Sequence, residues 1–86
     1  HRIELGEIEA ALETVEGVDR AVCLFLEEKN KIAAFYEGVA VKRDIAVGLE
    51  HLLPRYMFPA LYRNLTELPR TKNGKVDRQA LRRLYG

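Results

Sequence analysis

The chain has 86 residues, which is enough for one small domain with a modest core. Its composition, 48% apolar and 31% charged, indicates a globular domain, and no apolar run approaches the ~20 residues that span a bilayer. The net charge of +1 is unevenly distributed: residues 1–28 carry eight acidic side chains and two arginines, whereas residues 55–86 carry eight basic side chains and two acidic ones. The basic half could contact phosphates, carboxylates or nucleic acid, or could be only solvated surface, so charge alone does not decide the function.

The first predicted element is an amphipathic helix at the start of the chain. Its apolar side chains recur three or four positions apart, at Leu5, Ile8, Leu12 and Val15. Glutamates fill the positions between them, and the early ones lie favourably near the positive end of the helix dipole. We expect Gly17 to end this helix.

Two strands follow as a predicted hairpin. Residues 18–28 have apolar side chains at both odd and even positions. Such a strand has apolar side chains on both faces, so we expect both faces to be covered. Residues 29–31 make a polar turn, and residues 32–36 return as the second strand. Cys23, the only cysteine, lies inside the first strand and should be buried. A lone cysteine and the absence of a leader sequence favour a cytoplasmic protein.

The second half predicts a helix, a strand and a last short helix. The helix over 42–53 has an apolar stripe at Ile45, Leu49, Leu52 and Leu53, and Pro54 ends it. Residues 60–65 read as a third strand, and residues 69–74 as a polar loop. Asp77 is a good N-cap for a helix that contains Ala80, Leu81 and Leu84.

This order predicts one α+β domain over residues 1–86, with a small sheet of about three strands and helices packed on it. The predicted core is Leu5, Ile8, Leu12, Val22, Leu24, Phe35, Leu49, Leu52 and Leu81.

Several kinds of active site do not fit the sequence. The chain has no serine, and His1, His51 and Cys23 lack the spacing of a zinc site. Its glycines match neither the Walker nor the dinucleotide-binding pattern.

Lys75 is the strongest candidate functional residue. It directly follows Asn73-Gly74, a strong turn signal in which the glycine can adopt a positive φ, and it precedes the predicted helix cap. A lysine between a tight turn and a capped helix has a fixed backbone, so its ammonium can be aimed at a phosphate or carboxylate oxygen. On these residues alone, a loop lysine without a function remains the alternative.

Three segments resemble core motifs of adenylate-forming enzymes. Residues 73–78 (NGKVDR) resemble the last core motif in the form typical of nonribosomal peptide synthetase adenylation domains. Residues 1–9 (HRIELGEIE) resemble the eighth motif, and residues 53–59 (LPRYMFP) resemble a further landmark between them. The three motifs occur in the family's order over essentially the whole chain, which is identified as the mobile C-terminal lid of such a domain.

The resemblance implies a two-step reaction. ATP and Mg²⁺ activate an amino acid as its aminoacyl-adenylate, and the phosphopantetheine thiol of a carrier protein then takes the aminoacyl group. In the first step Lys75 would be the catalytic residue, contacting the substrate carboxylate and the ribose or bridging oxygens, with Asn73 and Gly74 beside it. The face used in the second step would include His1, Arg2, Glu4 and Gly6.

The partners implied are a large N-terminal subdomain and a carrier protein, with no nucleic acid, membrane or metal site on this chain. The large subdomain would hold the nucleotide and amino-acid pockets, so the 86 residues alone should be inactive. Two alternatives remain: the lid of an acyl-CoA or D-alanine–carrier-protein ligase, and a basic nucleic-acid-binding module.

Overall fold

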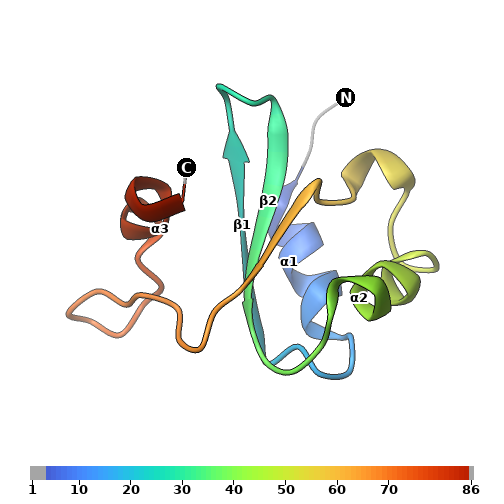
Figure 1. Cartoon of the computed structure of the whole chain (residues 1–86), viewed down its shortest axis with the longest axis horizontal. Helices are drawn as coiled ribbons and strands as arrows, with labels where there is room; N and C mark the ends of the chain where they lie inside the picture. The colour runs from blue at the N-terminus through green and yellow to red at the C-terminus, as the bar shows by residue number, and fades with distance from the viewer. Residues whose placement is uncertain (1–3, 86) are drawn as a thin grey trace.

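The computed structural model describes residues 4–85 and has the predicted α+β character (Figure 1). Its elements, in chain order, are α1 (Leu5–Glu13), β1 (Arg20–Leu26), β2 (Lys31–Glu37), α2 (Lys42–Leu49), the 3-10 helix η1 (Arg55–Met57), β3 (Leu61–Asn64) and α3 (Arg78–Tyr85). Within residues 4–85, no helix has the length and apolar character needed to cross a membrane.

The sheet is mixed, with strand order β1-β2-β3. β1 and β2 form the predicted antiparallel hairpin, with Val22 opposite Phe35. β3 pairs with β2 in parallel, with Leu61 opposite Ala33. A parallel pair cannot be joined by a tight turn, and α2 and η1 lie in the connection between these two strands.

Helices cover both faces of the sheet, as the two-faced apolar pattern of the first strand predicts. Figure 1 shows α1 and α2 on one side of the strands and α3 on the other. The first hydrophobic cluster includes Ile8, Leu12, Cys23, Ala34, Ile45 and Leu49. The second cluster, on the opposite face, includes Val22, Leu24, Phe35, Leu68 and Leu81. Successive β1 residues therefore alternate between two separate layers of the core.

The end of the second helix differs from the prediction. α2 stops at Leu49, and the amides of Leu52 and Leu53 both donate to the Leu49 carbonyl, at 2.9 and 3.0 Å. In this tightened turn Leu53 stays buried, one helical repeat after Leu49, whereas Leu52 is 50% exposed. The prediction of Leu52 as a core residue is therefore wrong.

Two other apolar positions lie near the surface, and only Leu5 of the two was predicted as a core residue. Leu84 is 67% exposed in the last turn of α3, where Leu81 and Tyr85 face the sheet instead. Leu5 is only partly buried, although it packs against the first cluster. Gly17 has φ +92° beyond the end of α1, as expected for the residue that turns the chain there.

Candidate functional site

The loop between β3 and α3 forms a small hairpin that carries Lys75. Arg70 and Val76 pair in an isolated antiparallel bridge at its base. Nearer its tip, the amide of Thr71 donates to the Lys75 carbonyl at 2.7 Å, and the amide of Gly74 donates to the Thr71 carbonyl at 3.0 Å. The backbone of Lys75 is thus held by hydrogen bonds within the loop.

Gly74 has the positive φ that the Asn73-Gly74 signal predicted, at +84°. The pattern matches a three-residue hairpin loop, in which a turn is followed by one residue in the left-handed region. A Cβ built on Gly74 would meet no atom within 4 Å, so backbone conformation rather than lack of space favours glycine here.

Glu37, at the end of the central strand, holds the start of this loop. Its Oε2 accepts a hydrogen bond from the Leu68 amide at 2.7 Å and lies 3.4 Å from Nη2 of Arg70. The Leu68 side chain, which is 1% exposed, packs in the second cluster. The loop therefore leaves the sheet from a fixed point.

Asp77 holds the other end of the loop. Its amide donates to the Pro69 carbonyl at 2.8 Å, and its Oδ1 accepts a hydrogen bond from the Ala80 amide at 3.0 Å. The second contact is the N-cap that the sequence predicted for α3. Lys75 therefore lies two residues before the N-cap of α3, so its backbone is fixed on both sides.

The Lys75 side chain is exposed, and its ammonium makes no ion pair or hydrogen bond with any of residues 4–85. The residue borders an open depression of about 440 Å³. The depression is lined by Glu9, Glu13, Arg20, Ala21, Val22, Gly74, Lys75, Val76 and Arg78. A cation at the rim of an open surface is placed to act on a group that another molecule or domain supplies.

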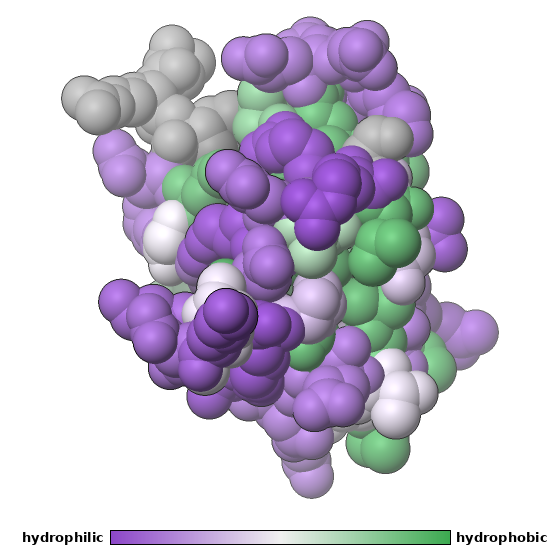
Figure 2. Space-filling view, turned by 90° about the vertical axis from the view of Figure 1, so that its left-hand side faces the viewer, coloured by the Kyte–Doolittle hydropathy of each residue, from purple (hydrophilic) through white to green (hydrophobic). Residues whose placement is uncertain are grey.

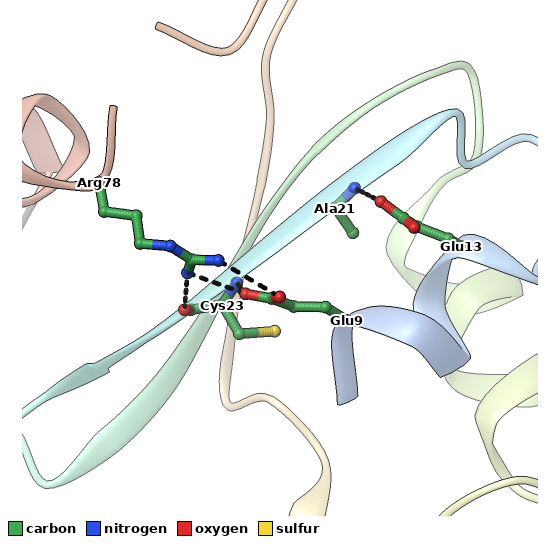
Figure 3. Close-up of polar contacts among 5 residues, drawn as sticks. All are labelled: Glu9, Glu13, Ala21, Cys23 and Arg78. Carbon is green, nitrogen blue, oxygen red and sulfur yellow. Dashed lines mark hydrogen bonds and ion pairs between the residues drawn. The ribbon is translucent and has the colours of Figure 1, made fainter. Parts of the chain in front are cut away.

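A polar contact that sequence reasoning missed joins the first and last helices across β1 (Figure 3). Nη1 of Arg78 lies 2.9 Å from Oε2 of Glu9 and donates to the Cys23 carbonyl at 3.2 Å. The same Glu9 oxygen accepts a hydrogen bond from the Cys23 amide at 2.8 Å. Glu9 and Arg78 end two of the recognised motifs, but the sequence holds no signal that pairs residues so far apart.

Similar contacts continue along the outer edge of β1. The Ala21 amide donates to Oε2 of Glu13 at 2.9 Å, and Nη1 of Arg82 donates to the Phe25 carbonyl at 3.1 Å. Side chains from α1 and α3 thus bond backbone groups of an edge strand that has no strand beyond it among residues 4–85.

Cys23 is a buried core residue, as predicted. Burial, reinforced by the Glu9 carboxylate and opposed by Arg78, raises the pKa of its thiol to about 12. At neutral pH the side chain is therefore a protonated thiol, which is a poor nucleophile. Among residues 4–85, no group of three or more His, Cys, Asp or Glu side chains is arranged to hold a metal ion.

The residues predicted for the second step lie at the other end of the chain. His1 and Arg2 are outside the described residues. Glu4 and Gly6 are exposed at the start of α1, and neither lines the depression beside Lys75. The structure therefore does not bring these two residues together with Lys75.

Figure 2 shows that hydrophilic residues dominate the side of the molecule where α3 and its loop lie.

These features define the class of the protein. It is a small α+β domain whose two-sided core supports a hairpin loop, and that loop presents the ammonium of Lys75 at the surface.

Comparisons with known proteins agree with this class. No protein-family model matches the chain. It is 44% identical over 85 residues to a component of the mycosubtilin synthase of Bacillus subtilis, covering 94% of this chain but 3% of that relative. Its fold matches NpsA of Klebsiella oxytoca in complex with 3-hydroxyanthranilyl-AMSN, with TM-score 0.90, 28% identity, and coverage of 98% of this chain and 18% of that one.

A third likeness is to a four-domain nonribosomal peptide synthetase bound to AMP and glycine. Its TM-score is 0.79 at 37% identity, and it covers 92% of this chain and 6% of the synthetase. The chain resembles the C-terminal subdomain of the adenylation domain of nonribosomal peptide synthetases.

Proposed function

We propose that this chain is the C-terminal lid of a larger enzyme that activates an amino acid with ATP and passes it to a carrier protein. Lys75 is the residue that the lid contributes to the activation step. The observation that carries the proposal is the geometry of Lys75: a backbone held on both sides, beside an exposed ammonium with no ionic partner among residues 4–85. The likeness to peptide synthetases supports amino-acid activation as the reaction in which this lysine takes part.

In the first half-reaction, an oxygen of the amino-acid carboxylate attacks the α-phosphorus of ATP. The bond from that phosphorus to the bridging oxygen of pyrophosphate breaks, giving the aminoacyl-adenylate and free pyrophosphate. Negative charge moves from the carboxylate to the leaving group during this step. The Lys75 ammonium stabilises that charge electrostatically, and its fixed backbone lowers the cost of reorganisation. No covalent bond to Lys75 is needed.

In the second half-reaction, the carrier's phosphopantetheine thiol attacks the carbonyl carbon of the adenylate. A thioester forms, AMP leaves, and the thiol proton passes to solvent or a base. For this step the lid turns to present its other face, which includes Glu4 and Gly6 at the exposed start of α1. The exposure of both residues, outside the depression that Lys75 lines, supports the use of two separate surfaces.

ATP and the amino acid are substrates whose main pockets belong to the large N-terminal subdomain. The part of this chain that we assign to them is the tip of the hairpin loop, with Asn73, Gly74 and Lys75. We assign no residue of this chain to the Mg²⁺ that accompanies ATP, which we place with the nucleotide in the large subdomain. The chain by itself should therefore neither catalyse exchange nor bind ATP tightly.

Relatives named as parts of peptide synthases favour amino-acid activation over the acyl-CoA and D-alanine alternatives. The nucleic-acid alternative is weakened because Arg70 and Arg78 are paired with Glu37 and Glu9 rather than forming a free basic surface. The deciding experiment is ATP–pyrophosphate exchange by the full-length enzyme over a panel of amino and fatty acids. Exchange that depends on an amino acid supports the proposal, and exchange only with fatty acids contradicts it.

A further inference from the structure

The contacts of Arg78 tie the Lys75 loop to the opposite side of the molecule. Arg78 is the first residue of α3 and lies three positions after Lys75. Its two terminal nitrogens reach both oxygens of Glu9, with Nη1 2.9 Å from Oε2 and Nη2 3.4 Å from Oε1. Nη1 also donates to the Cys23 carbonyl at 3.2 Å. One guanidinium therefore joins α3 to α1 and to the edge of β1, as Figure 3 shows.

Glu9 is well placed to hold this guanidinium. Its side chain is only 16% exposed, and the hydrogen bond from the Cys23 amide orients its carboxylate. The Arg78 side chain is 51% exposed, so the bridge lies at the surface and adds little to the overall stability. Its fork-to-fork geometry fixes direction as well as distance, which a lysine cannot reproduce.

The path from this bridge to Lys75 is short and continuous. Asp77 follows Val76 and precedes Arg78, and its amide is bonded to Pro69 at 2.8 Å. Both Lys75 and Arg78 line the same depression, together with Glu9. A shift of the first turn of α3 would therefore move the arm of the hairpin that carries Lys75.

We propose that Arg78 is a positioning residue for Lys75. Its bridge to Glu9 sets the position of the first turn of α3 against the β1 edge, and so aims the Lys75 ammonium. This inference rests on the proposed role of Lys75, because it assigns to Arg78 an effect that passes through that lysine.

The structural part is tested in the 86-residue chain, independently of any activity, by amide hydrogen exchange measured by NMR. Arg78→Lys should speed exchange of the Asp77 and Ala80 amides about tenfold, because the first turn of α3 opens locally more often. The Phe35 amide, in the central strand, should keep its protection, which excludes global unfolding. If the exchange rates of the Asp77 and Ala80 amides do not change, the proposal is wrong.

Arg82→Lys is the matched control. Arg82 also reaches from α3 to a β1 carbonyl, that of Phe25 at 3.1 Å, but one helical turn later and without a carboxylate partner in residues 4–85. The Arg82→Lys variant should leave the exchange rates of the Asp77 and Ala80 amides unchanged. If Arg82→Lys raises their exchange as much as Arg78→Lys does, α3 as a whole rather than the Glu9 bridge holds the loop, and the proposal fails.

The functional part is tested in the full-length enzyme by ATP–pyrophosphate exchange. Arg78→Lys and Glu9→Gln should each lower kcat about tenfold with little change in the KM for the amino acid, because misplacement affects the transition state. The double variant Lys75→Ala/Arg78→Lys should be no slower than Lys75→Ala alone, since Arg78 acts only through the lysine.

Two failures are distinguishable. If Lys75→Ala leaves exchange normal, the proposed function itself is wrong. If Lys75→Ala is slow and adding Arg78→Lys lowers the rate by a further factor of about ten, the role of Lys75 stands but Arg78 does not act through it.

Discussion

The carbonyl oxygen of Lys75 accepts a hydrogen bond from the Thr71 amide at 2.7 Å, and the Lys75 amide donates to the Thr71 hydroxyl oxygen at 3.3 Å. One threonine therefore holds both backbone polar groups of the lysine that we propose is catalytic. The side chain beyond that backbone makes no polar contact with residues 4–85. This combination, a fixed backbone and a free ammonium, makes the loop testable by single substitutions.

Lys75→Ala in the full-length enzyme should slow amino-acid-dependent ATP–pyrophosphate exchange about a hundredfold or more. This is the scale of loss when one preorganised electrostatic contact is removed. Lys75→Arg should restore little, because a planar fork differs from an ammonium in reach and shape. Transfer from pre-formed aminoacyl-adenylate to the carrier thiol should be much less affected.

Lys72→Ala and Arg70→Ala are the controls for this experiment, because both residues belong to the same loop. They should cause milder losses in the first half-reaction. Equal damage by Lys75→Ala to both half-reactions would indicate a merely structural lysine.

Gly74→Val should reduce exchange activity while the domain stays folded. The strain comes from the positive φ of +84°, since a Cβ at this position would meet no neighbour. Gly74→Asn is the matched variant, because asparagine tolerates the left-handed region, and it should retain much more activity. Circular dichroism checks folding, and a Gly74→Val enzyme with normal exchange activity would show that the loop conformation does not matter.

Leu12→Ala and Leu24→Ala should each lower the free energy of unfolding of the chain by about 2–5 kcal/mol. The two side chains are 0% and 2% exposed, and they belong to the first and second hydrophobic clusters respectively. Leu52→Ala, at a position that is 50% exposed, should change it by only about 0.5 kcal/mol. Urea unfolding measures all three, and a Leu12→Ala variant as stable as the parent would remove that residue from the core.

Stability should fall in alkaline solution because of Cys23. Its thiol has a pKa raised from 9.0 to about 12 in the folded chain, so the unfolded chain releases this proton first as the pH rises. Between these two values the free energy of unfolding should decrease by about 1.4 kcal/mol per pH unit. In the Cys23→Ala variant, the free energy of unfolding should decrease less steeply with pH. Burial also raises the pKa of Tyr36 and of Tyr62, and both residues remain in the variant, where Tyr62 loses only the smaller contribution that Cys23 makes to its shift.

Much of the fold could be predicted because its signals are local. The spacing of Leu5, Ile8 and Leu12 identified α1, and Asp77 identified the start of α3. Gly74 identified the one bend that the Lys75 loop requires. Each signal depends on neighbours within one or two turns, where sequence spacing translates directly into geometry.

The remainder depends on contacts between distant parts of the chain. The pattern of apolar residues in β3 does not indicate that this strand pairs in parallel with β2. The sequence also does not indicate that the Glu37 carboxylate bonds the Leu68 amide, 31 residues away. The bridge from Glu9 to Arg78 spans 69 residues, and each side chain alone looks like ordinary solvated charge. The prediction that Leu52 is buried was wrong for a local reason. Its spacing fits the apolar stripe of a helix, but α2 ends at Leu49, before that position.

The layered core has a consequence for folding intermediates. α3 completes the second cluster, in which Leu81 packs with Val22, Leu24 and Phe35, yet it is the last helix in the described part of the chain. The β1–β2 hairpin closes over a short turn and can form early, whereas docking of α3 must wait for contacts of long sequence separation. Until α3 docks, one apolar sheet face is bare, and shortening the chain before Arg78 should therefore turn a well-behaved domain into an aggregation-prone one.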